Sequence, residues 1–505
     1  MVTFRDSSVV ILDTSRDSVK GVLGLGDLLH VPSIEIQARV GLRHGHAHGL
    51  AAPPMSRANS GQANEGTPAA STSRAATQGP TPGARVNDYI VGTALDEALA
   101  AGQDIAVYWP FADGTVSDWT QAEALWKHVL FNGLGLRRAQ NESPVLLTLF
   151  PGLSRETYEH TCQIFFERLN VAGFSILERP TAQLYAANAL AGVAVDIGRS
   201  HTDITPFYDG LPINNARITI PLGTEMCARY LVPLLGGNTS VAQALDGLGI
   251  QGPARQAALE ELAAHAWRSG LVRAPGAVDQ PAPEDEGVTD IAAVVVAGKE
   301  RAVIESGMKK KATAKQTKEE QARAREIEAL DLVTTRFRGV ELTLGRERHR
   351  FCEPLFDAGL LVAMGEREAV VDKGMLMTIP QAVVHAVREC EVDQRRDIYS
   401  GLLVTGDIAS HVKGLGTTLT ARLAPYMLSN QENAQMNDVQ PVQARTVRVP
   451  DYFAEFRDRG DGLAAFLGAS IVAKITFHDG KNFVNKSEYS EKGPKAVLEY
   501  SPSLL

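Results

Sequence analysis

Hydrophobic and polar positions along this chain follow two periods, which predict helices alternating with strands. The segment WTQAEALWKHVL has apolar residues at the spacing i, i+3, i+4, i+7 and i+8. These residues are Ala122, Leu125, Trp126, Val129 and Leu130. The spacing predicts an amphipathic helix, with Ser117 or Asp118 as its N-terminal cap.

A second helix is predicted over SRETYEHTCQIFFERLN, and short apolar runs lie on both sides of it. One face of this helix would carry Tyr158, Cys162, Phe165, Phe166 and Leu169. Gly173 is a plausible stop for the helix. The runs SPVLLTLF and FSILE are typical of buried strands, and PTAQLYAANAL has a helical pattern. The order of these segments is therefore strand, helix, strand, helix.

Two hairpins of the same kind occur far apart in the chain, and each has a strand that runs into an aspartate. The first strand ends at Asp13, turns through residues 14–18 and resumes at Val19. The second ends at Asp196, turns at residues 198–200 and returns to Pro206. Two such hairpins in one α/β chain predict a duplicated lobe that faces itself across a cleft.

Two stretches interrupt this pattern. Residues 44–84 are mostly Ala, Gly, Pro, Ser and Thr, a composition that predicts a disordered loop. Residues 275–335 begin with a linker composition and continue, over 299–328, into a charged segment that is rich in helix-forming residues. We expect this second stretch to form a linker followed by a solvated helix.

Bulk composition narrows the class of protein. The chain has 505 residues, 44% hydrophobic and 22% charged, which fits a soluble protein with more than one domain or lobe. Its net charge of -9 argues against a surface that binds nucleic acid over its whole extent. Four cysteines without a CxxC pair predict neither a zinc site nor a disulfide framework. No signal peptide or membrane span is predicted, so we expect a cytosolic or nuclear protein.

Several ordered segments resemble actin and its relatives. The first hairpin and VPSIEIQARVG resemble the family's first phosphate hairpin and the segment after it. DGTVSDWTQAEALWKHVLFNGL and PVLLTLFPGLSRETYEHTCQIFFERLN follow in the family's order, as do PFYDG, RFCEPLFDAGLL, DIYSGLLVTGDI and FVNKSEYSEKGP. The resemblance spans nearly the whole chain, with the two interrupting stretches as insertions.

This resemblance implies an α/β fold of the actin/Hsp70/sugar-kinase type, which has two lobes with duplicated mixed sheets flanked by helices. The first lobe would contain residues 1–43, 85–186 and 449–505, with 44–84 as a disordered insertion. The second would contain 187–448, including the insertion at 275–335. Within the family, the early segment, the altered hairpin and the charged insertion look most like fungal actin-related protein 9. That subfamily belongs to the SWI/SNF and RSC chromatin remodellers.

An actin-type ATPase uses Gly-rich hairpins for phosphates, acidic residues for hydrated Mg²⁺, and a Gln and a His to place the attacking water. The matching positions define a vestigial nucleotide cleft: Asp13, Ser15, Arg16, Asp17, Lys20, Arg179, Asp196, Gly198, Arg199, Asp203, Gly406 and Asp407. The family's Gln falls on Arg179 and its His on Asp203, so neither residue that places the water is present. We expect no catalytic residue, no hydrolysis and no cofactor, with weak ATP–Mg²⁺ binding as the alternative.

The substitutions suggest what fills this cleft. Asp17 would repel a phosphate by like charge. Arg16, Arg179 and Arg199 would pair with Asp13 and Asp196 and close the lobes without a ligand. In the competing interpretation these arginines bind phosphate directly. Lys20 matches the family's phosphate-contacting lysine, and an exposed strand lysine is the equally weighted alternative.

The function that the resemblance implies is interaction rather than catalysis. A cleft that accepts partner helices would be lined by Tyr185, Ala186, Ala187 and Tyr208, although Tyr208 could instead be packed in the core. The expected partners are a second actin-related protein, in a heterodimer, and the HSA helix of a Snf2-type translocase. We expect a nuclear scaffold subunit that contacts nucleosomal DNA only indirectly, joins no membrane and forms no filament with itself. The alternatives are an actin-fold ATPase or nucleotide switch and, with the least support, a filament or dynactin-type component.

Two further clusters carry little weight. His44, His46 and His48 alternate in a glycine-rich tract, where a flexible segment is a better interpretation than a metal site, so no metal is predicted. The lysines of the charged insertion could form a nuclear localisation signal or a DNA contact. They are Lys309, Lys310, Lys311, Lys315 and Lys318. Glutamates are interspersed around them, so a solvated helix is at least as well supported.

Overall fold

The computed structural model describes residues 4–26, 29–43, 83–276, 331–364, 377–427, 441, 443–480 and 482–501. The predicted loop at 44–84 lies outside the described residues except for Gly83 and Ala84. His44, His46 and His48 also lie outside them. The charged segment 299–328 also lies outside them. At the end of the second insertion, residues 333–335 belong to a strand, so the predicted boundary at 335 is too late.

The chain divides into two compact units. Unit 1 contains Met1–Met226, Pro354–His411 and Leu419–Leu505, and unit 2 contains Cys227–Glu353 and Val412–Thr418. The predicted lobes, with breaks at 186/187 and 448/449, follow a different division and stay a prediction.

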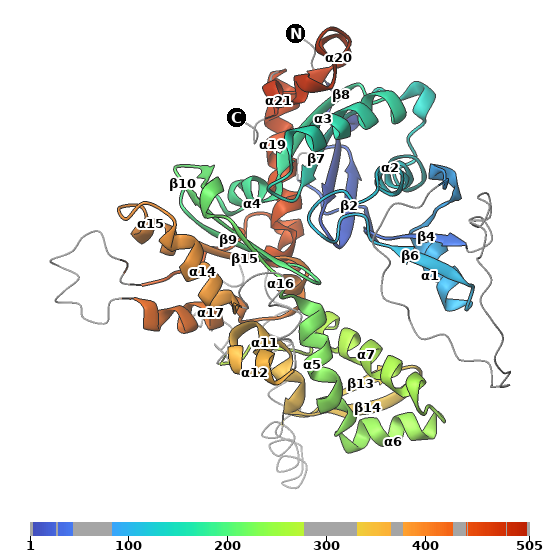
Figure 1. The fold of residues 1–505 in the computed structure, drawn as a ribbon, viewed down its shortest axis with the longest axis vertical. Coiled ribbons are helices and arrows are strands. Elements are labelled where there is room, and N and C mark those ends of the chain that lie inside the picture. The colour runs from blue at the N-terminus through green and yellow to red at the C-terminus, as the bar shows by residue number, and fades with distance from the viewer. Residues whose placement is uncertain are drawn as a thin grey trace, which may run out of the picture. The chain divides into compact units, whose positions relative to one another are not determined.

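Unit 1 contains two mixed sheets, as the sequence predicts (Figure 1). The strands of the first, in spatial order, are β16 (Val484–Asn485), β8 (Gly173–Glu178), β7 (Pro144–Leu149), β1 (Val10–Thr14), β2 (Ser18–Leu23) and β3 (Ile34–Gln37). Those of the second are β11 (Leu211–Pro212), β10 (Thr202–Tyr208), β9 (Gly192–Ile197) and β15 (Leu402–Thr405), with β12 (Ile218–Ile220) also paired to β10. A small third sheet has the order β5 (Ile90–Val91), β4 (Val40–Arg43) and β6 (Ile105–Tyr108).

The two larger sheets repeat one arrangement around an aspartate. In the first, Asp13 lies opposite Lys20 of the antiparallel β2 and opposite Thr148 of the parallel β7. In the second, Asp196 lies opposite Asp203 of the antiparallel β10 and Thr405 of the parallel β15. The duplication predicted from the two hairpins is therefore present in the topology.

Helices cover these sheets. Those of unit 1 are α1 (Thr93–Ala100), α2 (Trp119–Lys127), α3 (Arg155–Gln163), α4 (Arg179–Ala187), α12 (Ala358–Ala363), α14 (Ile379–Arg388), α15 (Arg395–Tyr399), α16 (Asp407–His411), α19 (Ala464–Asp479), α20 (Lys486–Lys492) and α21 (Ala496–Tyr500). Three helices each contain a point where the chain passes from one unit to the other: α5 (Thr224–Gly236), α11 (Glu353–Phe356) and α17 (Leu415–Leu423). Unit 2 itself contains α6 (Thr239–Gly247), α7 (Pro253–Arg268) and the hairpin of β13 (Val333–Phe337) and β14 (Val340–Leu344).

The two helices predicted from periodicity are present. Asp118 caps α2 by accepting the N–H groups of Thr120 and Gln121, and the five apolar residues predicted for its inner face are buried. Each helix continues into a π-helical turn, at His128–Gly133 and Ile164–Arg168. The predicted stop at Gly173 is wrong. The helix of α3 is over before Asn170, which has a positive φ of 55°, and Gly173 begins β8, where the Phe4 ring packs against it.

The helices α4 and α19 form the centre of unit 1. They lie side by side, and α19 also packs on β1 and β7 (Figure 1). A Cβ atom at Gly468 of α19 would lie 1.6 Å from the carbonyl oxygen of Ala182, so this close approach requires glycine. The segment Gly460–Asp479 is long and apolar enough to cross a membrane, but 67% of its 18-residue apolar window is buried inside the protein, which is typical of a core helix.

Candidate functional site

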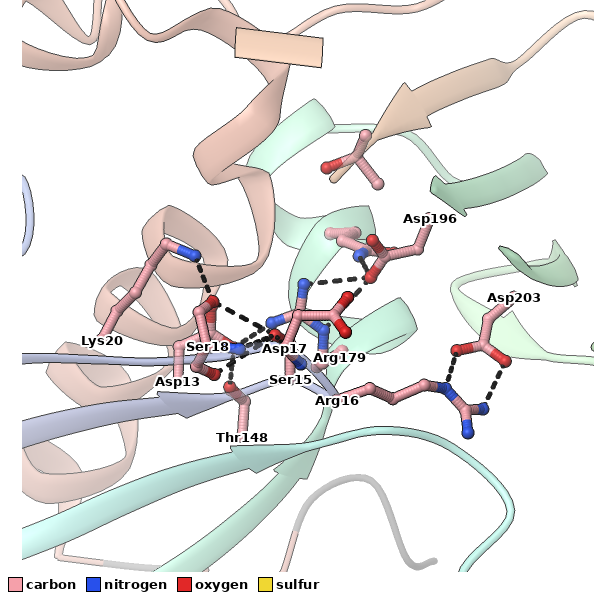
Figure 2. A network of polar contacts seen from close by, with 12 residues as sticks. Asp13, Ser15, Arg16, Asp17, Ser18, Lys20, Thr148, Arg179, Asp196 and Asp203 are labelled. Carbon is pink, nitrogen blue, oxygen red and sulfur yellow. Dashed lines mark hydrogen bonds and ion pairs between the residues drawn. The ribbon is translucent and has the colours of Figure 1, made fainter. Parts of the chain in front are cut away.

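The turns that follow β1 and β9 bring a cluster of charged side chains together within unit 1 (Figure 2). Asp13 and Asp196 are the penultimate residues of β1 and β9, and Arg179 begins α4 directly after β8. Because these strand ends meet at the same edge of the two sheets, residues far apart in sequence become neighbours.

Arg179 bridges the two aspartates. Its Nη1 donates to Asp13 Oδ1, and its Nε and Nη2 donate to Asp196 Oδ2 at 3.1 and 3.0 Å. Gln183, one turn later on α4, donates from Nε2 to the same Asp196 oxygen at 2.7 Å. The ion pairs predicted between Arg179 and these aspartates are confirmed.

The side chain of Asp13 is buried and held as a carboxylate. Thr148 donates from Oγ1 to Asp13 Oδ1 at 2.6 Å. Burial raises the pKa of Asp13, but the charges of Arg179 and Lys20 and the hydrogen bond from Thr148 outweigh it and hold that pKa below its usual value. The neighbouring cations therefore keep this buried group ionised.

Arg16 and Arg199 do not pair with Asp13 or Asp196, contrary to the prediction. Arg16 donates from Nε and Nη2 to both oxygens of Asp203, at 3.1 and 2.7 Å, across the two sheets. Arg199 points outward, where its guanidinium lies 4.6 Å from the ring centroid of Trp109 and 3.5 Å from Glu225. The reason is the geometry of the turn after β9, which directs a backbone N–H inward and the Arg199 side chain out.

Asp17 occupies the space that faces this turn. Its Oδ2 accepts the backbone N–H of Arg199 at 2.6 Å, and a Cβ atom at Gly198 would lie only 2.8 Å from that oxygen. Burial raises the pKa of Asp17, and the hydrogen bond from Arg199 offsets this in part. The charge that was expected to repel phosphate thus acts as an acceptor for the opposite turn.

Lys20 is buried rather than exposed, so the alternative of an exposed strand lysine is wrong. It lies directly opposite Glu35 in the β2–β3 register, and its Nζ is 3.3 Å from Glu35 Oε1 and 2.8 Å from Ser18 Oγ. Arg459 pairs with the same glutamate at 3.1 Å. Ser15 accepts the N–H of Ser18 at 2.9 Å and thereby shapes the first turn.

Besides the pair of Arg16 and Asp203, a second ion pair joins residues of the two sheets. Arg217, just before β12, pairs with Glu178 at the end of β8, and Tyr158 donates to the same glutamate at 2.9 Å. An open cavity of about 380 Å³ borders these pairs, with Arg16, Asp203 and Arg217 in its lining. Sequence reasoning missed Glu35, Glu178 and Arg217, whose roles depend on which strands are neighbours.

The turn at Gly406 is sterically restricted. Gly406 has a φ of 97°, and a Cβ atom there would lie 2.3 Å from the carbonyl oxygen of Ile197. Asp407 begins α16 and is exposed, whereas Ile408 is buried.

The residues of the cluster do not fit a magnesium triphosphate as they stand. Arg179 already neutralises the two aspartates that would face the metal, and the Asp17 carboxylate accepts the turn N–H that would face a phosphate. Among the described residues, no group of His, Cys, Asp or Glu is arranged to hold a metal ion.

The four residues predicted to line a partner cleft separate into two pairs. Tyr185 is 44% exposed and Tyr208 is half-buried. Ala186 and Ala187 are buried and pack in the hydrophobic cluster around α19, so they offer no surface to a partner. Leu190 and Leu211, which the sequence did not single out, are exposed beside the tyrosines: Leu211 pairs with Tyr208, and the Leu190 carbonyl accepts the N–H of Gly210.

Comparison with known proteins identifies the family to which this fold belongs. The family model described as actin matches residues 53–246 and 290–501. The chain belongs to the actin family. The hairpin of β1 and β2 lies outside the matched residues, although its place in the sheet follows the duplicated pattern.

A relative matches over nearly its whole length. The protein described as SWI/SNF and RSC complexes subunit arp9, from Schizosaccharomyces pombe, is 24% identical over 554 residues, covering 98% of this chain and 99% of that protein. The resemblance drawn from the sequence motifs is thereby confirmed.

Proposed function

We propose that this chain is a non-catalytic actin-related subunit of an ATP-dependent chromatin remodeller of the SWI/SNF or RSC type. Its membership of the actin family and its end-to-end similarity to the arp9 subunit support this proposal. The protein acts in the nucleus as a scaffold for the translocase subunit, together with a second actin-related protein.

The observation that carries the non-catalytic part is the bridge from Arg179 to Asp13 and Asp196. A guanidinium between two carboxylates provides the charge balance that a bound cation would otherwise supply. Asp203 accepts hydrogen bonds from Arg16 and from Thr219, so its carboxylate is held in an ion pair rather than free to take a proton from water. The chain accordingly keeps its fold without a nucleotide.

The scaffold part rests on the apolar surface of Tyr185, Leu190, Tyr208 and Leu211, which we name the α4–β11 surface. Its members come from α4, the loop after it and the β10–β11 hairpin. An amphipathic helix that lays its apolar face on such a surface is a common mode of recognition. We assign the HSA helix of the translocase to this surface.

Purification of the tagged chain from its own cells tests the proposal. We expect a Snf2-type translocase and a second actin-related protein to be recovered with it in equal amounts. The variant Leu211→Asp should lower translocase recovery, and Leu248→Asp, at an exposed leucine of unit 2, is the matched control. Recovery of microtubule-motor subunits in place of a translocase would overturn the proposal.

Titration with ATP and Mg²⁺ tests the non-catalytic part separately. We expect no change in the melting temperature of the purified chain, whereas a nucleotide-binding actin measured in parallel should be stabilised. A saturable stabilisation of this chain would favour the nucleotide-switch alternative.

A further inference from the structure

The two ends of the second insertion meet at one place in unit 2. The described chain stops at Gly276 and resumes at Asp331. Two consecutive residues, Arg348 and His349, form hydrogen bonds with the chain on both sides of this break. They belong to the short 3-10 helix Arg346–Cys352, which follows β14. Because adjacent side chains contact both ends, the ends are held close together although they are far apart in sequence.

Arg348 makes most of these contacts. The residue is 2% exposed, and its Nε donates to the carbonyl oxygen of Leu271, before the break, at 2.8 Å. After the break, its Nη1 donates to the carbonyl oxygen of Asp331 and its Nη2 donates to Asp331 Oδ1 at 2.7 Å. Nη1 also donates to the carbonyl oxygen of Gly345 at 2.6 Å. A buried guanidinium is stable only when its N–H groups have acceptors, so these carbonyl groups fix the side chain between the two ends.

His349 makes the same connection a second time. The backbone N–H of Arg273 donates to its Nδ1 at 3.0 Å, so this nitrogen carries no proton. The ring N–H is therefore on Nε2, which donates to Asp331 Oδ2 at 2.7 Å. Burial and the charge of Arg348 lower the pKa of His349, and contact with Asp331 offsets this only in part. The neutral ring that both contacts require is thus the form present at neutral pH.

Asp331 receives both side chains, one on each carboxylate oxygen. Burial raises the pKa of Asp331, but the hydrogen bonds from Arg348 and His349 outweigh it and hold that pKa below its usual value. The backbone of Asp331 has a φ of 52°, in the left-handed region that aspartate tolerates better than most residues. An ionised aspartate thus marks the point where the chain turns into β13.

The first end is also anchored elsewhere in unit 2. The N–H of Ala274 donates to the carbonyl oxygen of Lys413 at 2.9 Å, and Thr418 donates from Oγ1 to the carbonyl oxygen of Pro275 at 2.8 Å. These contacts hold the first end to residues 412–418, whereas Arg348 and His349 connect it to the second end.

We propose that Arg348 and His349 form a clasp that holds the two ends of residues 277–330 together and keeps unit 2 closed at the base of this insertion. Bringing the ends of a long segment together costs conformational entropy, and the hydrogen bonds of the clasp offset that cost. An insertion held in this way can bind another molecule or be cleaved without opening the unit that carries it. The clasp lies in unit 2, and its test needs none of the partners proposed above.

Hydrogen exchange of the full-length chain, followed by mass spectrometry of its peptides, tests the clasp. In Arg348→Met, we expect residues 271–276 and 331–337 to exchange about tenfold faster than in the native chain, while β1 and β2 are unchanged. The matched control is Arg338→Met, which removes an exposed arginine of the same unit that pairs with Glu261. It should leave exchange at both ends of the insertion unchanged.

The length of the insertion separates a clasp from ordinary packing. When a short glycine–serine linker replaces residues 277–330, the covalent chain itself holds the ends together. Arg348→Met should then raise exchange at the two ends much less than it does in the full-length chain. An equal increase with the insertion and with the linker would mean that Arg348 only supports the packing of unit 2, and the inference would fail.

Two variants of His349 test its two contacts separately and serve if Arg348→Met does not fold. In His349→Asn, the amide oxygen can take the place of Nδ1 and accept the N–H of Arg273, but the side chain is too short to reach Asp331. His349→Gln reaches Asp331 but offers no acceptor to Arg273. We expect faster exchange at residues 271–276 only for His349→Gln. Native exchange at both ends of the insertion in both His349 variants would overturn the clasp.

Discussion

The cluster around Arg179 and the outer side of α19 both carry cations that are at least half-buried, but only the cluster pairs them with carboxylates. In the cluster, Arg179 and Arg16 find carboxylates from other elements of the same chain. On the outer side of α19, Lys474 is half-buried and has no such partner in the described residues. The first arrangement balances its charge on folding, whereas Lys474 keeps its charge without an ion pair among the described residues. Charges of the first kind should therefore matter more for stability than that of Lys474.

Removing the bridge should have the largest effect on stability. Arg179→Ala leaves Asp13 and Asp196 without their cation in a buried setting, and we expect a loss of about 3–5 kcal/mol in the free energy of unfolding. Chemical denaturation at neutral pH measures it. Arg179→Lys keeps one charge without the fork that reaches both carboxylates, so its loss should be smaller. An unchanged unfolding midpoint for the alanine variant would contradict the bridge.

The pair of Arg16 and Asp203 should show a smaller but measurable coupling. A double-mutant cycle with Arg16→Met and Asp203→Asn should give a coupling energy of about 1–3 kcal/mol, because both side chains are largely buried and the contact uses two hydrogen bonds. The exposed pair of Arg338 and Glu261 in unit 2 is the control, with an expected coupling below about 1 kcal/mol. Equal coupling energies for the two pairs would contradict the expected difference between a largely buried and an exposed ion pair.

Asp13 and Asp17 should respond to pH with opposite signs. The lowered pKa of Asp13 contributes stability above its unfolded pKa, and this is lost as the pH falls through the folded value. The raised pKa of Asp17 means that the folded chain binds that proton more tightly, so ionised Asp17 lowers stability at neutral pH.

The variant Asp17→Asn tests whether the ionised Asp17 carboxylate lowers the stability of the folded chain. The amide oxygen can still accept the N–H of Arg199, so we expect a higher melting temperature at neutral pH and a difference that narrows as the pH falls through the acidic range. Thermal unfolding across that range measures it. A variant that is less stable than the native chain at neutral pH would show that the Asp17 charge is favourable where it lies.

A change at Lys474 of α19 should have the smallest effect on stability. Lys474→Ala removes no intramolecular hydrogen bond or ion pair within the described residues, so the free energy of unfolding should change by less than about 0.5 kcal/mol. Chemical denaturation of the isolated chain measures it. A loss comparable to that of the Arg16 variant would mean that Lys474 has a structural partner after all.

Local patterns predicted most of the secondary structure around the site. The apolar periodicity of α2, the capping residue Asp118 and the two hairpins that end in aspartate could be identified because each depends on residues close in sequence. The end of α3 was placed too late because Gly173 was interpreted as a helix stop. Gly173 instead begins β8, where a Cβ atom would lie 3.1 Å from the Phe4 ring, a tight contact that favours glycine.

The amino-acid sequence by itself determined that this chain has a duplicated actin-type pattern and that arginines and aspartates replace residues of a nucleotide site. Tertiary structure alone decided which of these charges meet. Arg179 reaches both aspartates because it begins the helix at the edge where the two sheets meet, and Glu35 reaches Lys20 through the register of β2 and β3. Arg199 is directed away because its turn presents a backbone N–H to Asp17 instead. The residue type sets the sign of each charge. Which opposite charge it pairs with depends on distances that only the packed strands and helices fix.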